Sequence, residues 1–219
     1  MDGAIRDEER NILKAYNMLL YFAGTMIMWD PSIECIQDFW NEGILKKLPV
    51  SSGNPRFMTA ASLLRDSIES NQTSFGNMTK DFHSLFTEAS GALAPQIGSK
   101  FINGSSSVKE FYDSYGWKSK FKDHFPDDHL GIELLFLTLM TEKYLDFEDY
   151  ACRNEMAGEI IRFIDQHITT WVPQWNDAVQ IYSGTQAYKG IATLILACCE
   201  DIHSLMERKT VSQKKITAV

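Results

Sequence analysis

Several features are scarce or missing in this chain of 219 residues, and each absence excludes a class of function. Lys and Arg total 21 against 29 Asp and Glu, so the formal net charge is −8 and no basic face for nucleic acid is expected. The longest apolar run, near Leu130–Met140, is interrupted by Glu133 and is far shorter than the about 20 residues of a membrane span. The first ten residues are too charged for a signal peptide, so we expect a cytoplasmic protein.

Sequence motifs for cofactors and for catalysis are missing as well. The chain has no Walker loop, no G-x-G-x-x-G and no nucleophile elbow. Its four cysteines, Cys35, Cys152, Cys198 and Cys199, form no C-x-x-C pair, and no two Cys/His pairs have zinc-finger spacing. We therefore expect reduced thiols and no metal, with vicinal redox chemistry at Cys198–Cys199 as a minor alternative.

Helical periodicity is what the sequence does contain, almost from end to end. Apolar residues recur at spacings of three and four, and no alternating strand pattern or internal repeat is present. This pattern predicts an all-α, single-domain multi-helix bundle of roughly eight to ten helices over residues 1–206. A basic tail, 207–219, is expected to be disordered. The expected helices are 5–23, one from about 30 to 43, 57–68, 78–89, 107–116, 129–144, 150–169, 171–182 and 185–206.

An irregular stretch, Ser90–Ser107, interrupts this pattern. It contains several glycines, a proline and three successive serines, and a loop of this length inside a compact domain is often functional. Two interpretations stay open. Leu93, Pro95, Ile97 and Phe101 either flank a groove for an apolar peptide or pin an ordinary surface loop.

The richest group of polar residues follows a second break, where the chain reads FPDDHLGIE over 125–133. Asp127 and Asp128 place negative charge at a helix N-terminus, where the helix dipole favours it. Two carboxylates can bind a guanidinium through paired, charge-assisted hydrogen bonds, so the pattern indicates an acidic and aromatic pocket for a cationic peptide group. The ordinary alternative, which residue types alone favour, is a helix capped by Asp127 or Asp128. The candidate residues here are Pro126, Asp127, Asp128, His129 and Glu133.

An enzyme built from the same residues is the weakest alternative. Asp128 and His129 are adjacent and do not face each other on a helix, so they are poorly placed as a general base and its partner. His129 and Glu133 have i, i+4 spacing for a metal, but a di-iron bundle needs Glu-x-x-His pairs on two helices. The sequence has no such pairs, and we therefore expect that the protein is not an enzyme.

In their order along the chain, these segments resemble the TorD/DmsD family of cytoplasmic chaperones for molybdenum enzymes, also called redox enzyme maturation proteins. The resemblance covers most of the chain and is strongest from Asp81 to Met140. The matching stretches are DFHSLF at 81–86, APQIGSKF at 94–101, VKEFYDSYG at 108–116, PDDHLG at 126–131 and WVPQW at 171–175.

This resemblance implies a function in the maturation of an exported enzyme. Family members bind the twin-arginine signal peptide of a molybdoenzyme catalytic subunit and hold the apoprotein back until its molybdopterin cofactor is inserted. Some bind that cofactor or a guanine nucleotide weakly, and some form domain-swapped dimers. The resemblance thus implies a monomer or a domain-swapped dimer with no stably bound cofactor. The predicted peptide-binding residues are Pro126, Asp127, Asp128, His129 and Glu133, with Ile97, Gly98 and Ser99 in the preceding loop.

Two positions depart from the family pattern. Relatives often carry a tryptophan where Ile97 stands and a glutamate where Phe125 stands. The peptide contacts and the client enzyme are therefore expected to differ from those of chaperones for dimethyl sulfoxide or trimethylamine N-oxide reductase. The alternative to a chaperone is a helical ligand-binding or regulatory module with an apolar cavity inside its bundle.

Overall fold

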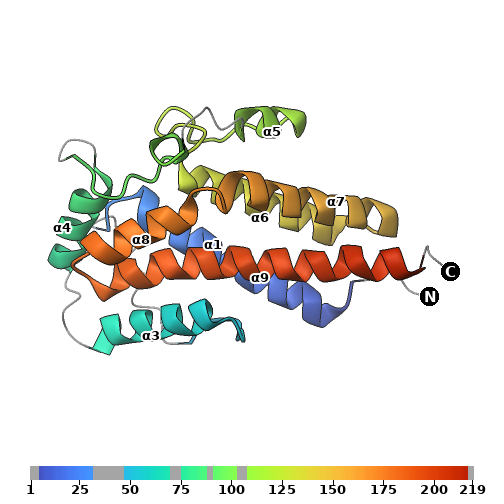
Figure 1. Cartoon of the computed structure of the whole chain (residues 1–219), viewed down its shortest axis with the longest axis horizontal. Helices are drawn as coiled ribbons and strands as arrows, with labels where there is room; N and C mark the ends of the chain where they lie inside the picture. The colour runs from blue at the N-terminus through green and yellow to red at the C-terminus, as the bar shows by residue number, and fades with distance from the viewer. Residues whose placement is uncertain (1–4, 32–46, 70–74, 88–90, 103–107, 217–219) are drawn as a thin grey trace.

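The computed structural model describes residues 5–31, 47–69, 75–87, 91–102 and 108–216, and these form an all-α bundle, as the periodicity predicts (Figure 1). Eight α-helices lie within the described ranges, joined by turns that include a 3-10 turn at Gly98–Lys100 and a π-helical turn at Ile164–Ile168. The helices are α1 (Asp7–Met28), α3 (Pro55–Glu69), α4 (Phe75–Phe86), α5 (Val108–Ser114), α6 (Leu130–Asp146), α7 (Tyr150–Phe163), α8 (Val172–Tyr182) and α9 (Gln186–Ile216).

The long helix α9 organises the bundle. In Figure 1 it runs along the centre of the molecule, with α3 on one side and α6 and α7 on the other. α9 packs against α3, α1, α7 and α8, while α1 also packs against α6. Large apolar side chains, including those of Trp171 and Trp175, fill the space between these helices. The largest fully buried side chains include Trp171, Trp175, Tyr188, Phe22, Phe136 and Phe163.

Several predicted helix ends are wrong. α1 continues five residues beyond the expected end, to Met28, and the expected helix 150–169 changes to a π-helical turn after Phe163. α9 does not end at Met206 but continues to Ile216. Lys209 on this extension forms an ion pair with Glu9, which is only 4% exposed and also accepts a hydrogen bond from Tyr144 Oη at 2.8 Å. Most of the helix expected between 30 and 43 lies outside the described residues.

A buried aspartate fastens the connection between α8 and α9 to α4. The carboxylate of Asp81 accepts hydrogen bonds from Ser183 Oγ and Thr185 Oγ1, both at 2.7 Å, and from the backbone N–H groups of Gly184 and Thr185, at 2.9 and 3.0 Å. Asp81 is 7% exposed, and charge-assisted bonds of this kind are the strong ones in a protein interior. The aspartate that begins the DFHSLF segment therefore has a structural role: it holds the α8–α9 connection against α4.

The described part of the chain contains neither a membrane-spanning helix nor a cluster of metal-ligating side chains. None of its helices has the length and apolar content needed to span a membrane. None of its His, Cys, Asp and Glu side chains gather in a group of three that could hold a metal ion.

Candidate functional site

The loop before the 3-10 turn and the turn before α6 are held together by their backbones. Leu130 N–H donates to Gln96 O at 2.8 Å, Gly98 N–H donates to Asp128 O at 2.9 Å, and Ile97 and His129 form an isolated antiparallel bridge. This junction brings together all of the predicted loop residues and the Asp128–His129 pair, which are about thirty residues apart in sequence. The combination of a proline-bearing loop and a PDDH turn is thus one structural unit.

Asp128 is the one predicted residue whose carboxylate is both anchored and partly accessible to solvent. Its Oδ2 accepts a hydrogen bond from the backbone N–H of Ser99 at 2.9 Å. The indole of Trp171 lies directly under the loop, since a Cβ on Gly98 would lie 3.2 Å from Trp171 Nε1. The loop therefore fixes the direction of the carboxylate while leaving acceptor capacity for another donor.

The other two residues of the turn have different surroundings. Pro126 is exposed, and its carbonyl accepts a hydrogen bond from His129 N–H at 3.1 Å. Asp127 is partly buried, and its carbonyl accepts from Tyr112 Oη at 3.1 Å, which ties the turn to α5. Asp127 and Asp128 are consecutive residues, so the turn carries two carboxylates at the N-terminus of α6.

His129 does not point outwards but caps α6. Its Nδ1 accepts a hydrogen bond from Gly131 N–H at 3.0 Å, so His129, and not Asp127 or Asp128 as expected, is the N-cap residue. The ring is 4% exposed and packs against Phe125 with a centroid distance of 4.6 Å. Burial lowers the pKa of His129 to about 4, against a smaller opposing effect of the Asp128 charge. At neutral pH it is therefore an uncharged residue that positions the turn.

Glu133 is buried deeper still. It is fully inaccessible, and no described residue offers a donor with hydrogen-bonding geometry to either carboxyl oxygen. Burial, and then the negative charge of Asp128, raise the pKa of Glu133 well above its usual range, and the nearby indole of Trp171 offsets this only in part. Burial therefore disfavours the charged form of Glu133 and keeps its carboxyl away from the surface of the turn.

An aromatic cluster beside the turn was not predicted as part of the site. Trp29, just after α1, makes edge-to-face contacts with Phe121, His124 and Phe125, at centroid distances of 5.7, 6.0 and 5.1 Å. The sequence signal at this place is the WDP break at 29–31. It indicates that a helix ends there, but it does not indicate which side chains Trp29 contacts. Through Phe125 this cluster reaches the ring of His129.

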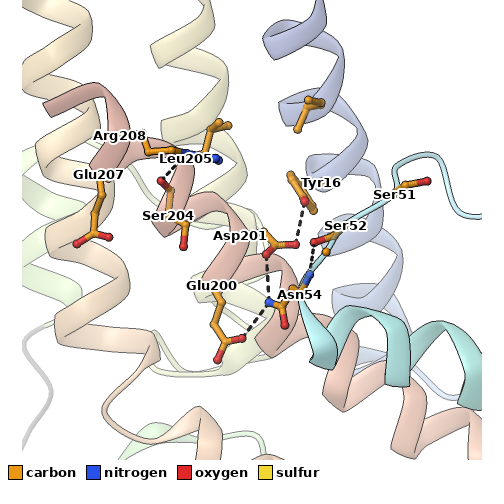
Figure 2. A pocket seen from close by; sticks show the side chains of 12 residues that line it. Tyr16, Ser51, Ser52, Asn54, Glu200, Asp201, Ser204, Leu205, Glu207 and Arg208 are labelled. Carbon is orange, nitrogen blue, oxygen red and sulfur yellow. Dashed lines mark hydrogen bonds between the residues drawn. The ribbon is translucent and has the colours of Figure 1, made fainter. Parts of the chain in front are cut away.

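A separate hollow of about 1220 Å³ lies between α1, the chain before α3, and α9. Figure 2 shows the carboxylates of Glu200 and Asp201 directed towards the side chain of Asn54, whose Nδ2 donates to each at 3.1 Å. Asp201 also accepts from Tyr16 Oη at 2.8 Å, and Arg56 pairs with Glu200. This hollow is open, and its lining mixes polar side chains with apolar ones such as Ile12 and Leu205, so it differs from the apolar bundle cavity of the alternative hypothesis. Its central carboxylates already accept hydrogen bonds.

Comparisons with known proteins connect the chain to a described family. The family described as nitrate reductase delta subunit matches residues 54–177, more than half of the chain and including both segments of the junction. The chain belongs to this family. Its membership confirms the TorD/DmsD resemblance and agrees with the prediction that the protein is not an enzyme.

Individual relatives point in the same direction. The chain is 27% identical over 138 residues to proteins named chaperone protein TorD from two strains of Vibrio cholerae serotype O1, El Tor Inaba N16961 and Classical Ogawa 395. The matched region covers 59% of this chain and 63% of each relative, so the similarity spans less than two thirds of the length of these proteins.

Proposed function

We propose that the protein is a maturation chaperone that binds the twin-arginine signal peptide of a molybdoenzyme catalytic subunit. In this proposal it acts in the cytoplasm, without a stably bound cofactor of its own, and retains the apoprotein until its molybdopterin cofactor is inserted. Family membership supports the general class, because the matched relatives are named as chaperones.

The partly accessible Asp128 carboxylate is the observation that carries the peptide-binding proposal. One of its oxygens is held by Ser99 N–H, so its position is fixed before any ligand arrives. A pre-organised carboxylate loses little conformational freedom on binding, and a guanidinium is the side chain whose geometry matches it best. Asp127 adds a second negative charge to the same turn, while the buried residues His129 and Glu133 support it from below.

The roles within the predicted site are therefore unequal. Asp128 and Asp127 are assigned to the arginines, and Ser99, Gly98 and Ile97 hold the loop against them. His129 positions the turn by capping α6. Pro126 sets the entry of the chain into that turn, and Glu133 makes no direct contact with the peptide.

Calorimetric titration tests this proposal. The titrant is the twin-arginine signal peptide of a molybdoenzyme encoded next to this protein, and a twin-lysine version is the control. We expect one peptide per chain, with affinity reduced at least about tenfold in Asp128→Asn or with the lysine peptide. Asp177→Asn, an exposed aspartate on α8, is the matched control and is expected to bind like the wild type. Equal affinity of Asp128→Asn and wild type for the arginine peptide would reject the assigned site.

A further inference from the structure

We infer that an apolar side chain of the bound signal peptide, close behind its arginines, enters a pocket between α1 and α6. This inference rests on the proposed function and adds the place where the apolar part of the peptide binds. The pocket has a volume of about 130 Å³. An apolar cavity of roughly 150 Å³ holds benzene, and this somewhat smaller pocket has room for a single branched aliphatic side chain.

Two glycines account for the pocket. A Cβ on Gly131 would lie only 2.3 Å from Cγ of Met28, so the first turn of α6 approaches the end of α1 too closely for any side chain at that position. On α1, Gly24 leaves space instead, since its Cβ would meet Leu134 Cδ1 at an ordinary 3.8 Å. The walls are apolar or lack a side chain, and they include Leu20, Gly24, Met28, Gly131, Leu134 and Leu135.

The rim of the pocket is continuous with the acidic turn. Trp29 and Phe121 line it, and Trp29 also contacts Phe125, whose ring packs against His129 of the turn. A series of ring contacts therefore connects the acidic turn, where a ligand would place its cations, to the rim of the pocket. Carboxylates followed by an apolar pocket match a partner with cations followed by apolar residues, which is the order of chemistry in a twin-arginine signal peptide.

The surface next to the pocket carries two exposed apolar side chains. Met18 and Tyr21 lie three residues apart on α1 and are 50% and 53% exposed. Tyr21 lines both the pocket and a neighbouring hollow of about 540 Å³ along the α1–α6 seam, and Met18 lines that hollow. Single exposed apolar residues are common, but these two continue the apolar surface from the pocket along α1.

The loop at 91–102 is the other apolar candidate, and among its apolar side chains only Leu93 is exposed, at 44%. Phe101 stacks on Trp171 with a centroid distance of 5.6 Å, and the backbone of Ile97 forms the bridge with His129. Ala94 is fully buried, and its carbonyl accepts a hydrogen bond from the Trp175 indole at 3.1 Å. The loop thus serves to hold Asp128, and the α1–α6 pocket is left for the apolar run.

Filling the pocket from α1 tests the inference. Gly24→Leu places a side chain in it, and Gly158→Leu is the matched control, because Gly158 is also a helix-interior glycine and its Cβ would have nothing within 4 Å. In calorimetric titrations with the twin-arginine peptide, we expect Gly24→Leu to bind at least about tenfold more weakly and Gly158→Leu to bind within about twofold of the wild type. With a peptide whose apolar run is replaced by serines but whose arginines remain, Gly24→Leu and wild type are expected to bind equally.

A milder variant guards against misfolding. Gly24→Ala adds one methyl group in ordinary contact and favours the helix, and it is expected to weaken binding by about threefold. Circular dichroism melts identify which variants are folded. Wild-type affinity in the folded Gly24 variants, together with loss of affinity in Asp128→Asn, would overturn the pocket and leave the proposed function standing. Failure of the wild type to bind any twin-arginine peptide would overturn both.

Discussion

Two aspartates in this protein are used in opposite ways. Asp81, under the α8–α9 connection, is buried and accepts four hydrogen bonds from Ser183, Gly184 and Thr185. Asp128, before α6, is partly exposed and accepts one bond, from Ser99 N–H. A carboxylate offers about four acceptor positions, so the first residue is saturated and the second is not. Asp81 therefore serves the fold, and the unused capacity of Asp128 is available to a ligand.

The largest expected effect is on stability, at Asp81. Asp81→Asn replaces an acceptor by an amide donor that faces existing donors, which leaves buried polar groups unsatisfied. We expect the free energy of unfolding to fall by about 2–4 kcal/mol, measured by urea denaturation. The affinity of the folded protein for a twin-arginine peptide should stay within about twofold of the wild type. A variant that is as stable as the wild type would show that these hydrogen bonds do not hold the connection.

The second effect concerns pH and the residue that caps α6. Because burial lowers the pKa of His129 to about 4 in the folded protein, the unfolded chain takes up a proton at pH 5 that the folded protein does not. This contribution to stability is present above pH 6.5 and decreases by about 2 kcal/mol between pH 7 and pH 5. His129→Asn keeps a good N-cap without a titrating ring. Denaturation at both pH values should show a smaller loss in this variant; an identical loss would contradict the assignment.

The third effect separates binding from stability at Asp128. Asp128→Asn removes the charge but keeps an oxygen that can accept from Ser99 N–H. We therefore expect a loss of peptide affinity of about 1.5–3 kcal/mol, with a change in unfolding free energy below about 1 kcal/mol. The same binding should weaken when salt is raised from about 0.1 M to about 1 M, because exposed charges are then screened. A large loss of stability with unchanged affinity would show that Asp128, like Asp81, serves the fold and not the binding of the peptide.

The smallest effect is expected at Glu133. Burial raises the pKa of Glu133 well above its usual range and so disfavours its charged form, and Glu133→Gln replaces the carboxyl by an uncharged group of similar size. The variant should be at least as stable as the wild type at pH 7, because an amide has no charged form to be disfavoured by burial. Peptide affinity should change by less than about twofold. A tenfold loss of affinity would return Glu133 to the group of residues that contact the peptide.

The general architecture could be predicted from the sequence because apolar periodicity is a local property. The helices α3, α6 and α8 lie within two residues of their expected starts and ends. The predicted end of α9 was wrong because the extension of this helix is held by a residue far away in sequence. Lys209 on the extension forms an ion pair with the buried Glu9.

The candidate site could be predicted only in part, because contacts between residues far apart in sequence decide which of its side chains are exposed. Residue types placed carboxylates at the start of α6, and the resemblance connected them to Gly98 and Ser99. Which of these side chains is exposed depends on tertiary packing: His129 and Glu133 look like surface partners in the sequence, but both are buried. Trp29 comes from a distant helix end, so no pattern around residue 126 could indicate it.

The most direct test of this account is a double-mutant cycle between Asp128 and the peptide arginines. Wild type and Asp128→Asn are each titrated with the twin-arginine peptide and with a version that carries citrulline, an uncharged analogue, in place of both arginines. We predict a coupling energy of about 1.5–3 kcal/mol, so that the citrulline peptide binds both proteins with similar affinity. Additive effects, with no coupling between the carboxylate and the guanidinium groups, would contradict the claim that the open carboxylate at the start of α6 binds the arginines.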